Sequence, residues 1–138
     1  MMHAQTPAKP LPLVVLPDSF AICRLAPDVP VPDWATQPSR FLTLSRTAEE
    51  LSITTLQSNV PSAVQCERDY RAIKVQGPLS LNLIGILASI ANPLADAGLS
   101  IFAISTYDTD YVLVKEAVLD SAVAVLGRAG HEVRIEAP

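Results

Sequence analysis

The order of apolar patterns in the second half of the chain is the feature that most constrains the fold. Two stretches, 83–94 and 118–129, repeat apolar residues at the spacing of an amphipathic helix. Short apolar or alternating runs, which are typical of strands, flank and separate them. These runs cover residues 70–75, 100–105, 111–114 and 132–136. The pattern therefore predicts the order β-α-β-β-α-β over about residues 69–138.

Glycine and proline mark the ends of the two predicted helices. Gly98 and Gly130 follow the helical patterns, as glycine commonly does at a helix C-terminus. Pro93 predicts that the first helix is kinked or split near Asn92, because proline lacks the N–H that a helix interior uses. The resulting order is that of a ferredoxin-like α+β fold, in which an antiparallel sheet carries two helices on one face.

The first half of the chain predicts strands but no long helix. Strand-like patterns cover residues 11–16, 20–25, 41–45 and 53–56. Prolines at positions 27, 30, 32 and 38 exclude a long helix before residue 39. Thr47 and Glu50 have the spacing of a capping box, which predicts a single helical turn there.

A weak internal repeat relates the two halves. When the second half is shifted back by 60 residues, 101–107 lies over 41–47 and 111–113 lies over 51–53. The match indicates a tandem of two related modules, the first with reduced helices. Each module is small for an independent core, so we expect the two to pack on each other or on a second chain.

The predicted organisation has three parts. Residues 1–10 form a flexible tail, 11–66 the N-terminal module and 67–138 the C-terminal module. The polar, irregular stretch 57–69 links the two modules.

Charge and composition exclude several classes of partner. The net charge of −4 offers no basic footprint for a nucleic acid. The most apolar stretch, 79–104, is interrupted by polar residues and proline, so it contains no membrane span. The N-terminus lacks the layout of a signal peptide, and Cys23 and Cys66 lie in no metal-like spacing. We therefore expect a cytoplasmic protein without a disulfide framework.

The sequence offers little for catalysis. Of the two histidines, His3 lies in the tail, and His131 follows a helix-ending glycine, where histidine commonly complements the helix C-terminus. Cys23 and Cys66 are interpreted as small buried apolar residues. There is no glycine-rich phosphate loop and no compact group of metal ligands. We expect no enzyme, no cofactor and no metal. An enzymatic alternative would need an activity that depends on His131, Cys23 or Cys66.

One polar run remains, Ser105–Asp110, between two apolar strands. It is either a solvated hairpin loop or a half-buried ligand pocket. In a pocket, Asp108 or Asp110 would hold an ammonium group by a charge-assisted hydrogen bond. Hydroxyl groups of the run, together with helix N-terminal N–H groups near residues 77–82, would hold a carboxylate.

The residues before and within this run carry a family resemblance. The stretch Ala97–Thr106 resembles the signature of ACT domains, as in the regulatory regions of aspartate kinases. The continuation Tyr107–Val114 looks similar to tandem ACT proteins, which include animal cytosolic arginine sensors. The resemblance extends over about residues 11–136 and implies two ferredoxin-like ACT modules with antiparallel sheets.

The resemblance also implies a function and a set of site residues. It implies a regulatory protein that binds a small, amino-acid-like ligand at the interface between ACT modules. Asp110 would face the amino group or a basic side chain of that ligand. The other implied ligand-binding residues are Leu83, Ile84, Gly85, Ile104, Ser105, Thr106 and Tyr107. Kinase ACT domains usually carry Asn or Asp where this chain has Ser100, which weakens one expected contact.

Two outcomes of ligand binding remain open at this point. A ligand signal would reach a protein partner or change the oligomeric state of the chain itself, most simply a homodimer. The alternative is a structural or interaction module that keeps the ACT fold and binds a partner, or itself, without a ligand. Exposed sheet edges would carry such contacts.

Overall fold

A computed structural model describes residues 10–80 and 83–138. Nearly all of the expected tail, and the end of the loop 77–82, lie outside these residues. The strands are β1 (Pro12–Val15), β2 (Phe20–Leu25), β3 (Thr43–Arg46), β4 (Leu51–Leu56), β5 (Cys66–Val75), β6 (Phe102–Ser105), β7 (Asp110–Lys115) and β8 (Glu132–Ile135). The helices are α1 (Ile86–Asp96) and α2 (Leu119–Arg128), with short 3₁₀ turns η1 (Asp33–Thr36), η2 (Gln57–Asn59) and η3 (Glu116–Val118).

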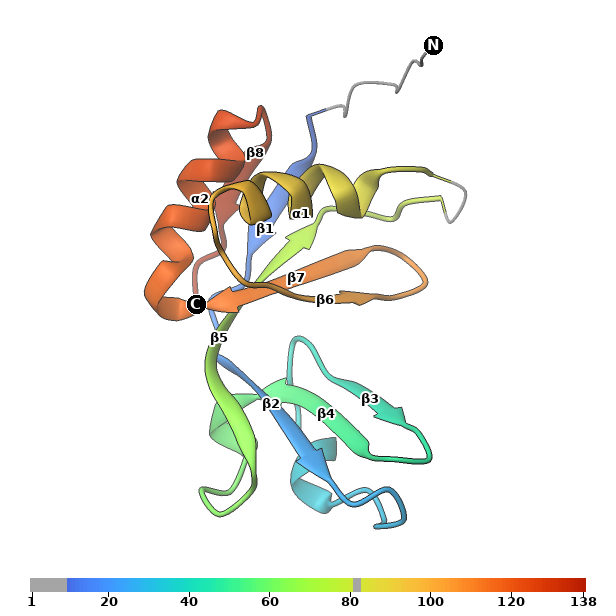
Figure 1. Ribbon diagram of the computed structural model, residues 1–138. Coiled ribbons are helices and arrows are strands. Elements are labelled where there is room, and N and C mark those ends of the chain that lie inside the picture. The colour runs from blue at the N-terminus through green and yellow to red at the C-terminus, as the bar shows by residue number, and fades with distance from the viewer. Residues whose placement is uncertain (1–9, 81–82) are drawn as a thin grey trace.

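The strand β5 runs through both halves of the molecule. Its N-terminal part pairs with β2, whereas its C-terminal part lies between β1 and β7. One half therefore has the strand order β3-β4-β2-β5, and the other has the order β6-β7-β5-β1-β8. Figure 1 shows α1 and α2 together on one side of the second half, and no α-helix beside β2, β3 and β4. The predicted α+β fold with two helices is confirmed.

The expectation of purely antiparallel sheets is wrong for one strand pair. β1 pairs antiparallel with β5 but parallel with β8, from Pro12 opposite Glu132 to Val15 opposite Ile135. A ferredoxin-like order would place β8 directly beside β5. Here β1 is inserted between β5 and β8. Both β1 and β8 run antiparallel to β5, so they run parallel to each other. The division into modules at 11–66 and 67–138 stays a prediction.

The hairpin of β3 and β4 in the first half corresponds to the hairpin of β6 and β7 in the second. The predicted helical turn at Thr47 is wrong. The same offset of 59 residues separates the starts of three pairs of elements: β3 and β6, β4 and β7, and η2 and η3. This offset is one residue shorter than the 60 that the sequence pattern indicated. Thr47 N–H donates to the Glu50 carbonyl at 2.9 Å, and Thr106 N–H donates to the Thr109 carbonyl at 2.8 Å. The Thr47 hydroxyl does accept from Glu50 N–H, as a cap would, but it closes a hairpin turn instead of starting a helix.

Three apolar clusters hold the fold together. The largest lies between the helices and the sheet and includes Ile73, Val75 and Ile90. A second covers the other face of this sheet, where Phe41 stacks on Tyr111 with ring centroids 4.2 Å apart. The third fills the first half and includes Ile53. Because Phe41 precedes β3, its ring packs the first half against the second.

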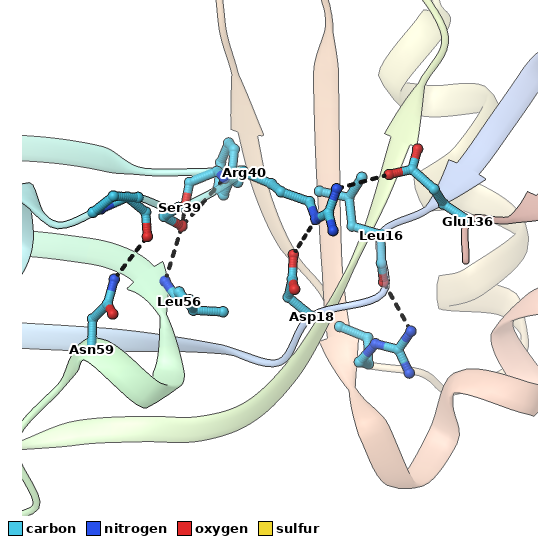
Figure 2. Close-up of polar contacts among 10 residues, drawn as sticks. Leu16, Asp18, Ser39, Arg40, Leu56, Asn59 and Glu136 are labelled. Carbon is cyan, nitrogen blue, oxygen red and sulfur yellow. Dashed lines mark hydrogen bonds and ion pairs between the residues drawn. The ribbon is translucent and has the colours of Figure 1, made fainter. Parts of the chain in front are cut away.

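Polar contacts also join the two halves (Figure 2). Arg40, just before β3, donates to Asp18 at 3.0 Å and approaches Glu136 at 3.5 Å. Within the first half, Ser39 accepts the N–H of Leu56 at 3.2 Å and so holds the segment that carries Arg40. The arginine is half exposed, so its ion pairs contribute at most about 1 kcal/mol. The apolar contact therefore dominates the junction.

A β-bulge lets β5 pass from one half to the other. Tyr70 pairs with Phe20 and Glu67 with Ile22, so Arg68 and Asp69 together oppose a single residue of β2. Asp69 has a φ of 65°, in the left-handed region. The side-chain amide of Gln57 accepts Asp69 N–H and donates to its carboxylate at 2.9 Å. Gln57 thus hydrogen-bonds both the backbone and the side chain of Asp69.

Asp69→Val should destabilise the fold by about 1–3 kcal/mol, because a β-branched residue is strained at this φ and cannot bond Gln57. Glu67→Val is the matched control, since Glu67 lies in the same strand with an exposed side chain and outside the left-handed region. The free energy of unfolding in urea would measure both. Equal effects of the two variants would contradict the assigned strain.

The helix α1 continues through Pro93, so the predicted split near Asn92 is wrong. Proline has no N–H to donate to the carbonyl four residues earlier, which is that of Ser89. His131 Nε2 lies 3.0 Å from this Ser89 carbonyl, and His131 Nδ1 accepts Leu11 N–H at 3.1 Å. These partners assign the proton to Nε2. The ring is buried, and it bonds α1 and the start of β1 instead of the C-terminus of α2.

His131→Ala should lower the free energy of unfolding by about 2–4 kcal/mol, because it leaves Leu11 N–H and Ser89 C=O unpaired. In a Pro93→Ala background the loss should be about 1 kcal/mol smaller, since the substitution restores a backbone N–H that reaches the Ser89 carbonyl. Urea denaturation of the four proteins in this double-mutant cycle measures the difference. Additive effects would show that His131 does not replace the missing helix hydrogen bond.

Candidate functional site

The turn between β6 and β7 is fixed by its own hydroxyl groups. Ser105 pairs with Asp110 across the hairpin, and its hydroxyl donates to the Asp110 carboxylate. Thr106 Oγ1 donates to the Thr109 carbonyl at 3.1 Å and accepts Thr109 N–H at 3.3 Å. The buried Thr109 hydroxyl donates to the carbonyl of Val75 at 2.6 Å. The polar run is therefore anchored to the end of β5 through the buried Thr109, whereas Ser105, Thr106, Tyr107 and Asp108 are exposed.

The segment after β5 packs closely against this turn. Leu79 N–H donates to the Asp108 carbonyl at 2.7 Å. A Cβ atom at Gly77 would lie only 3.1 Å from the Asp108 carbonyl oxygen and 3.3 Å from Thr109 Cβ. Glycine at position 77 thus allows two backbone segments to approach each other, which closes one wall of the site.

A cavity of about 200 Å³ lies between these two segments and the start of α1. Its lining residues are Leu79, Ser80, Leu83, Ile86, Ser105, Thr106, Tyr107, Asp108, Thr109 and Asp110. Six residues singled out from the sequence are therefore brought together: Leu83, Ser105, Thr106, Tyr107, Asp108 and Asp110. The structure adds Leu79, Ser80, Ile86 and Thr109. Thr109 could have been included, since it belongs to the same polar run.

Three of the predicted site residues lie elsewhere. Ile84 is 94% exposed and does not line the cavity. Gly85 is the N-cap residue of α1, with a φ of 81°, and contributes no side chain. Ile104 packs with Phe41 and Tyr111 on the sheet face opposite the helices. Ile104 and Ser105 are neighbours in β6, so their side chains point to opposite faces of the sheet.

The electrostatic character of the cavity comes from two carboxylates and one helix end. Asp108 and Asp110 belong to its lining, and so does the first residue of α1, Ile86. Within residues 10–80 and 83–138, no side chain caps this helix N-terminus, which carries a partial positive charge. Figure 1 shows the start of α1 at the same end of the molecule as the β6–β7 turn. The cavity thus offers both an anionic and a cationic pole.

The carboxylate of Asp108 also acts on a neighbouring tyrosine. Burial raises the pKa of Tyr111 above its ordinary value, and the negative charge of Asp108 raises it further. Both effects disfavour the phenolate, so Tyr111 stays neutral at physiological pH. Its ring remains an uncharged partner for Phe41.

A larger cavity of about 440 Å³ lies over β2–β5 in the first half and holds none of the predicted site residues. Arg24 lines it but already donates to the Glu49 carbonyl at 2.9 Å, and the Glu67 side chain there is 73% exposed. The smaller cavity is the better candidate, because it brings six of the residues predicted from the sequence together with the start of α1.

Neither a membrane span nor a metal centre is found in the described parts of the chain. Within residues 10–80 and 83–138, the helices are too short and too polar to cross a bilayer. The same residues form no group of three or more His, Cys, Asp or Glu side chains placed to hold a metal ion.

Sequence comparisons identify the class of protein. Residues 65–128 match the family model described as ACT domain, and residues 18–63 match one described as the N-terminal domain of another family. A 60-residue segment is 42% identical to the human protein named cytosolic arginine sensor for mTORC1 subunit 1. The segment is 43% of this chain but 18% of that protein, so the chain spans only a small part of this curated relative.

Solved structures extend the similarity over nearly the whole chain. A protein of Agobacterium tumefaciens is 34% identical, with a TM-score of 0.89 over 95% of this chain and 97% of that one. The regulatory subunit of aspartate kinase from Thermus flavus shares the fold at 12% identity, with a TM-score of 0.61 over 88% of this chain and 99% of that chain. The chain therefore contains an ACT domain, over residues 65–128.

Gly77→Ala should destabilise the fold by about 1 kcal/mol, because the added methyl group forces the β6–β7 turn away from residues 77–79. Gly127→Ala is the matched control: Gly127 lies within α2 with open space around it, so the change should stabilise by about 0.5–1 kcal/mol. Thermal or urea unfolding measures both. A stabilising Gly77→Ala would contradict the close approach of the two segments.

Proposed function

We propose that this chain is a non-catalytic regulatory protein that binds a small amino-acid ligand in the cavity between the β6–β7 turn and α1. The observation that carries the proposal is the pairing of two carboxylates with an uncapped helix N-terminus across one cavity. A zwitterion has the complementary pair of charges. Membership of a family whose fold neighbours include regulatory subunits supports a regulatory role.

Each pole of the ligand has its own residues. Asp110, with Asp108 beside it, holds the ammonium group or a basic side chain by charge-assisted hydrogen bonds. N–H groups at the start of α1, beyond Gly85, hold the carboxylate. The hydroxyl protons of Ser105 and Thr106 are already donated within the turn. The ligand side chain lies against the apolar part of the lining, which consists of Leu79, Leu83, Ile86 and the ring of Tyr107.

The ligand lies at an interface between ACT modules when the site is complete. Leu83, Ile84 and Tyr107 are exposed by 52%, 94% and 81%, which is unusual for large apolar side chains. Burial of these side chains by a second module, most simply from another copy in a homodimer, closes the cavity. The correspondence between the β3–β4 hairpin and the β6–β7 hairpin supports a tandem of two ACT modules within the chain. The cytosolic arginine sensor supports a cytoplasmic location.

A thermal-shift screen against the twenty amino acids tests ligand binding directly. A ligand at 100 times its dissociation constant should stabilise the fold by about 2.7 kcal/mol. Asp110→Asn and Asp108→Asn should weaken binding tenfold or more, because each removes a charge facing the ammonium group. Glu49→Gln is the matched control, since Glu49 lies at the same place in the other hairpin. The absence of any shift at millimolar amino acid would refute the proposal.

The exposed apolar residues also favour a second function, that of an interaction module without a ligand. In that case, the mass in solution would be that of a stable dimer and would not change with any amino acid. Ile84→Ser together with Tyr107→Ser would dissociate it. Analytical ultracentrifugation with and without amino acids separates the two functions.

A further inference from the structure

The two cysteines of the chain face each other across neighbouring strands. Cys23 in β2 and Cys66 in β5 are Cα partners in an antiparallel pair, and both thiols are free. They lie 43 positions apart in the sequence, with no spacing motif between them. Only the register of β2 on β5 brings them together.

The hydrogen bonds between β2 and β5 show whether the two cysteines form a hydrogen-bonded or a non-hydrogen-bonded pair. Arg24 N–H donates to the carbonyl of Gln65 at 3.0 Å, so the pair next to the cysteines is a hydrogen-bonded one. Antiparallel pairs alternate, and Cys23 and Cys66 therefore form a non-hydrogen-bonded pair, with Cα atoms about 4.5 Å apart. Disulfides need Cα separations of about 4.4–6.8 Å. The backbone already meets this requirement.

The two thiols differ in their access to solvent. Cys23 is 1% exposed, whereas Cys66 is half-buried and donates to the carbonyl of Val64 at 3.1 Å. Burial, followed by the hydrogen bond to Cys66 and its charge, raises the pKa of Cys23 to about 12. Cys66 is therefore the thiol that an oxidant reaches, and Cys23 keeps its proton until Cys66 has reacted.

We propose that Cys23 and Cys66 form a redox modification site, in which a small disulfide such as oxidised glutathione converts them to an intramolecular cross-strand disulfide. The Cys66 thiolate attacks the glutathione disulfide, which breaks the S–S bond, forms a mixed disulfide and releases one glutathione thiolate. Cys23 then loses its proton to solvent and attacks the Cys66 sulfur. The Cys23–Cys66 bond forms and a second glutathione leaves. Two protein thiols are oxidised, and one glutathione disulfide is reduced.

The position of the bond determines its effect. β2 belongs only to the first half, whereas β5 belongs to both, and the pair lies three residues before the bulge at Asp69. The disulfide would tie the first half to the shared strand and close a loop that includes β3 and β4. Such a loop closure restricts the unfolded chain, so the oxidised form should be the more stable one. The site is separate from the ligand cavity.

The experiment uses the folded full-length chain incubated with oxidised glutathione and followed by intact mass and maleimide labelling. We expect loss of both thiols, a mass lower by two hydrogens and no retained glutathione. The melting temperature should rise by on the order of 10 °C and return after reduction. Closure should accelerate from about pH 7 to about pH 9, because attack requires the Cys23 thiolate.

Two variants assign the order of the steps. Cys23→Ser should accumulate a stable glutathione adduct on Cys66, because the second thiol is missing. Cys66→Ser should stay unmodified, because Cys23 is buried. In the wild-type chain, a lasting glutathione adduct, a disulfide-linked dimer or thiols that stay reduced would each overturn the proposal.

Discussion

The strand β5 is the element on which the rest of the structure depends. Its ten residues provide an edge for β2 in one half and lie between β1 and β7 in the other. Side chains near the two ends of this strand thereby enter two separate cores, with Cys66 in one and Ile73 in the other. The bulge at Asp69, held by Gln57, lies where this strand passes from one half of the eight-stranded sheet to the other. Neither half has a complete sheet without it.

The candidate site also depends on β5, through the backbone at its C-terminal end. The Val75 carbonyl accepts the Thr109 hydroxyl, and the Leu79 N–H group binds the Asp108 carbonyl. These bonds fix the turn without using the carboxylates of Asp108 and Asp110, although Asp110 accepts the hydroxyl of Ser105. The turn is thus held largely by groups other than the two carboxylates that we propose as ligand-binding groups. A site of this kind can change its ligand by side-chain substitution while keeping its shape.

The two hairpins show why only one half carries the candidate site. Thr47 and Thr106 close their turns in the same way. The second turn lies beside the N-terminus of α1, which supplies one wall and the positive pole. The first half has only the 3₁₀ turns η1 and η2, since prolines between residues 27 and 38 exclude a long helix. In the described part of the chain, the turn at Thr47 therefore has no α-helix N-terminus beside it, although its backbone hydrogen bonding is equivalent.

The sequence by itself determined the features that depend on local periodicity. These are the two helices, most strands, the shortage of helix in the first half and the polar run Ser105–Asp110. Only the tertiary structure decided how residues far apart combine. It inserted β1 between β5 and β8, placed His131 on the carbonyl left free by Pro93, and set Cys23 opposite Cys66. It also separated Ile84 and Ile104 from the cavity. Strand register and helix packing are set by long-range contacts, which leave no local pattern in a single sequence.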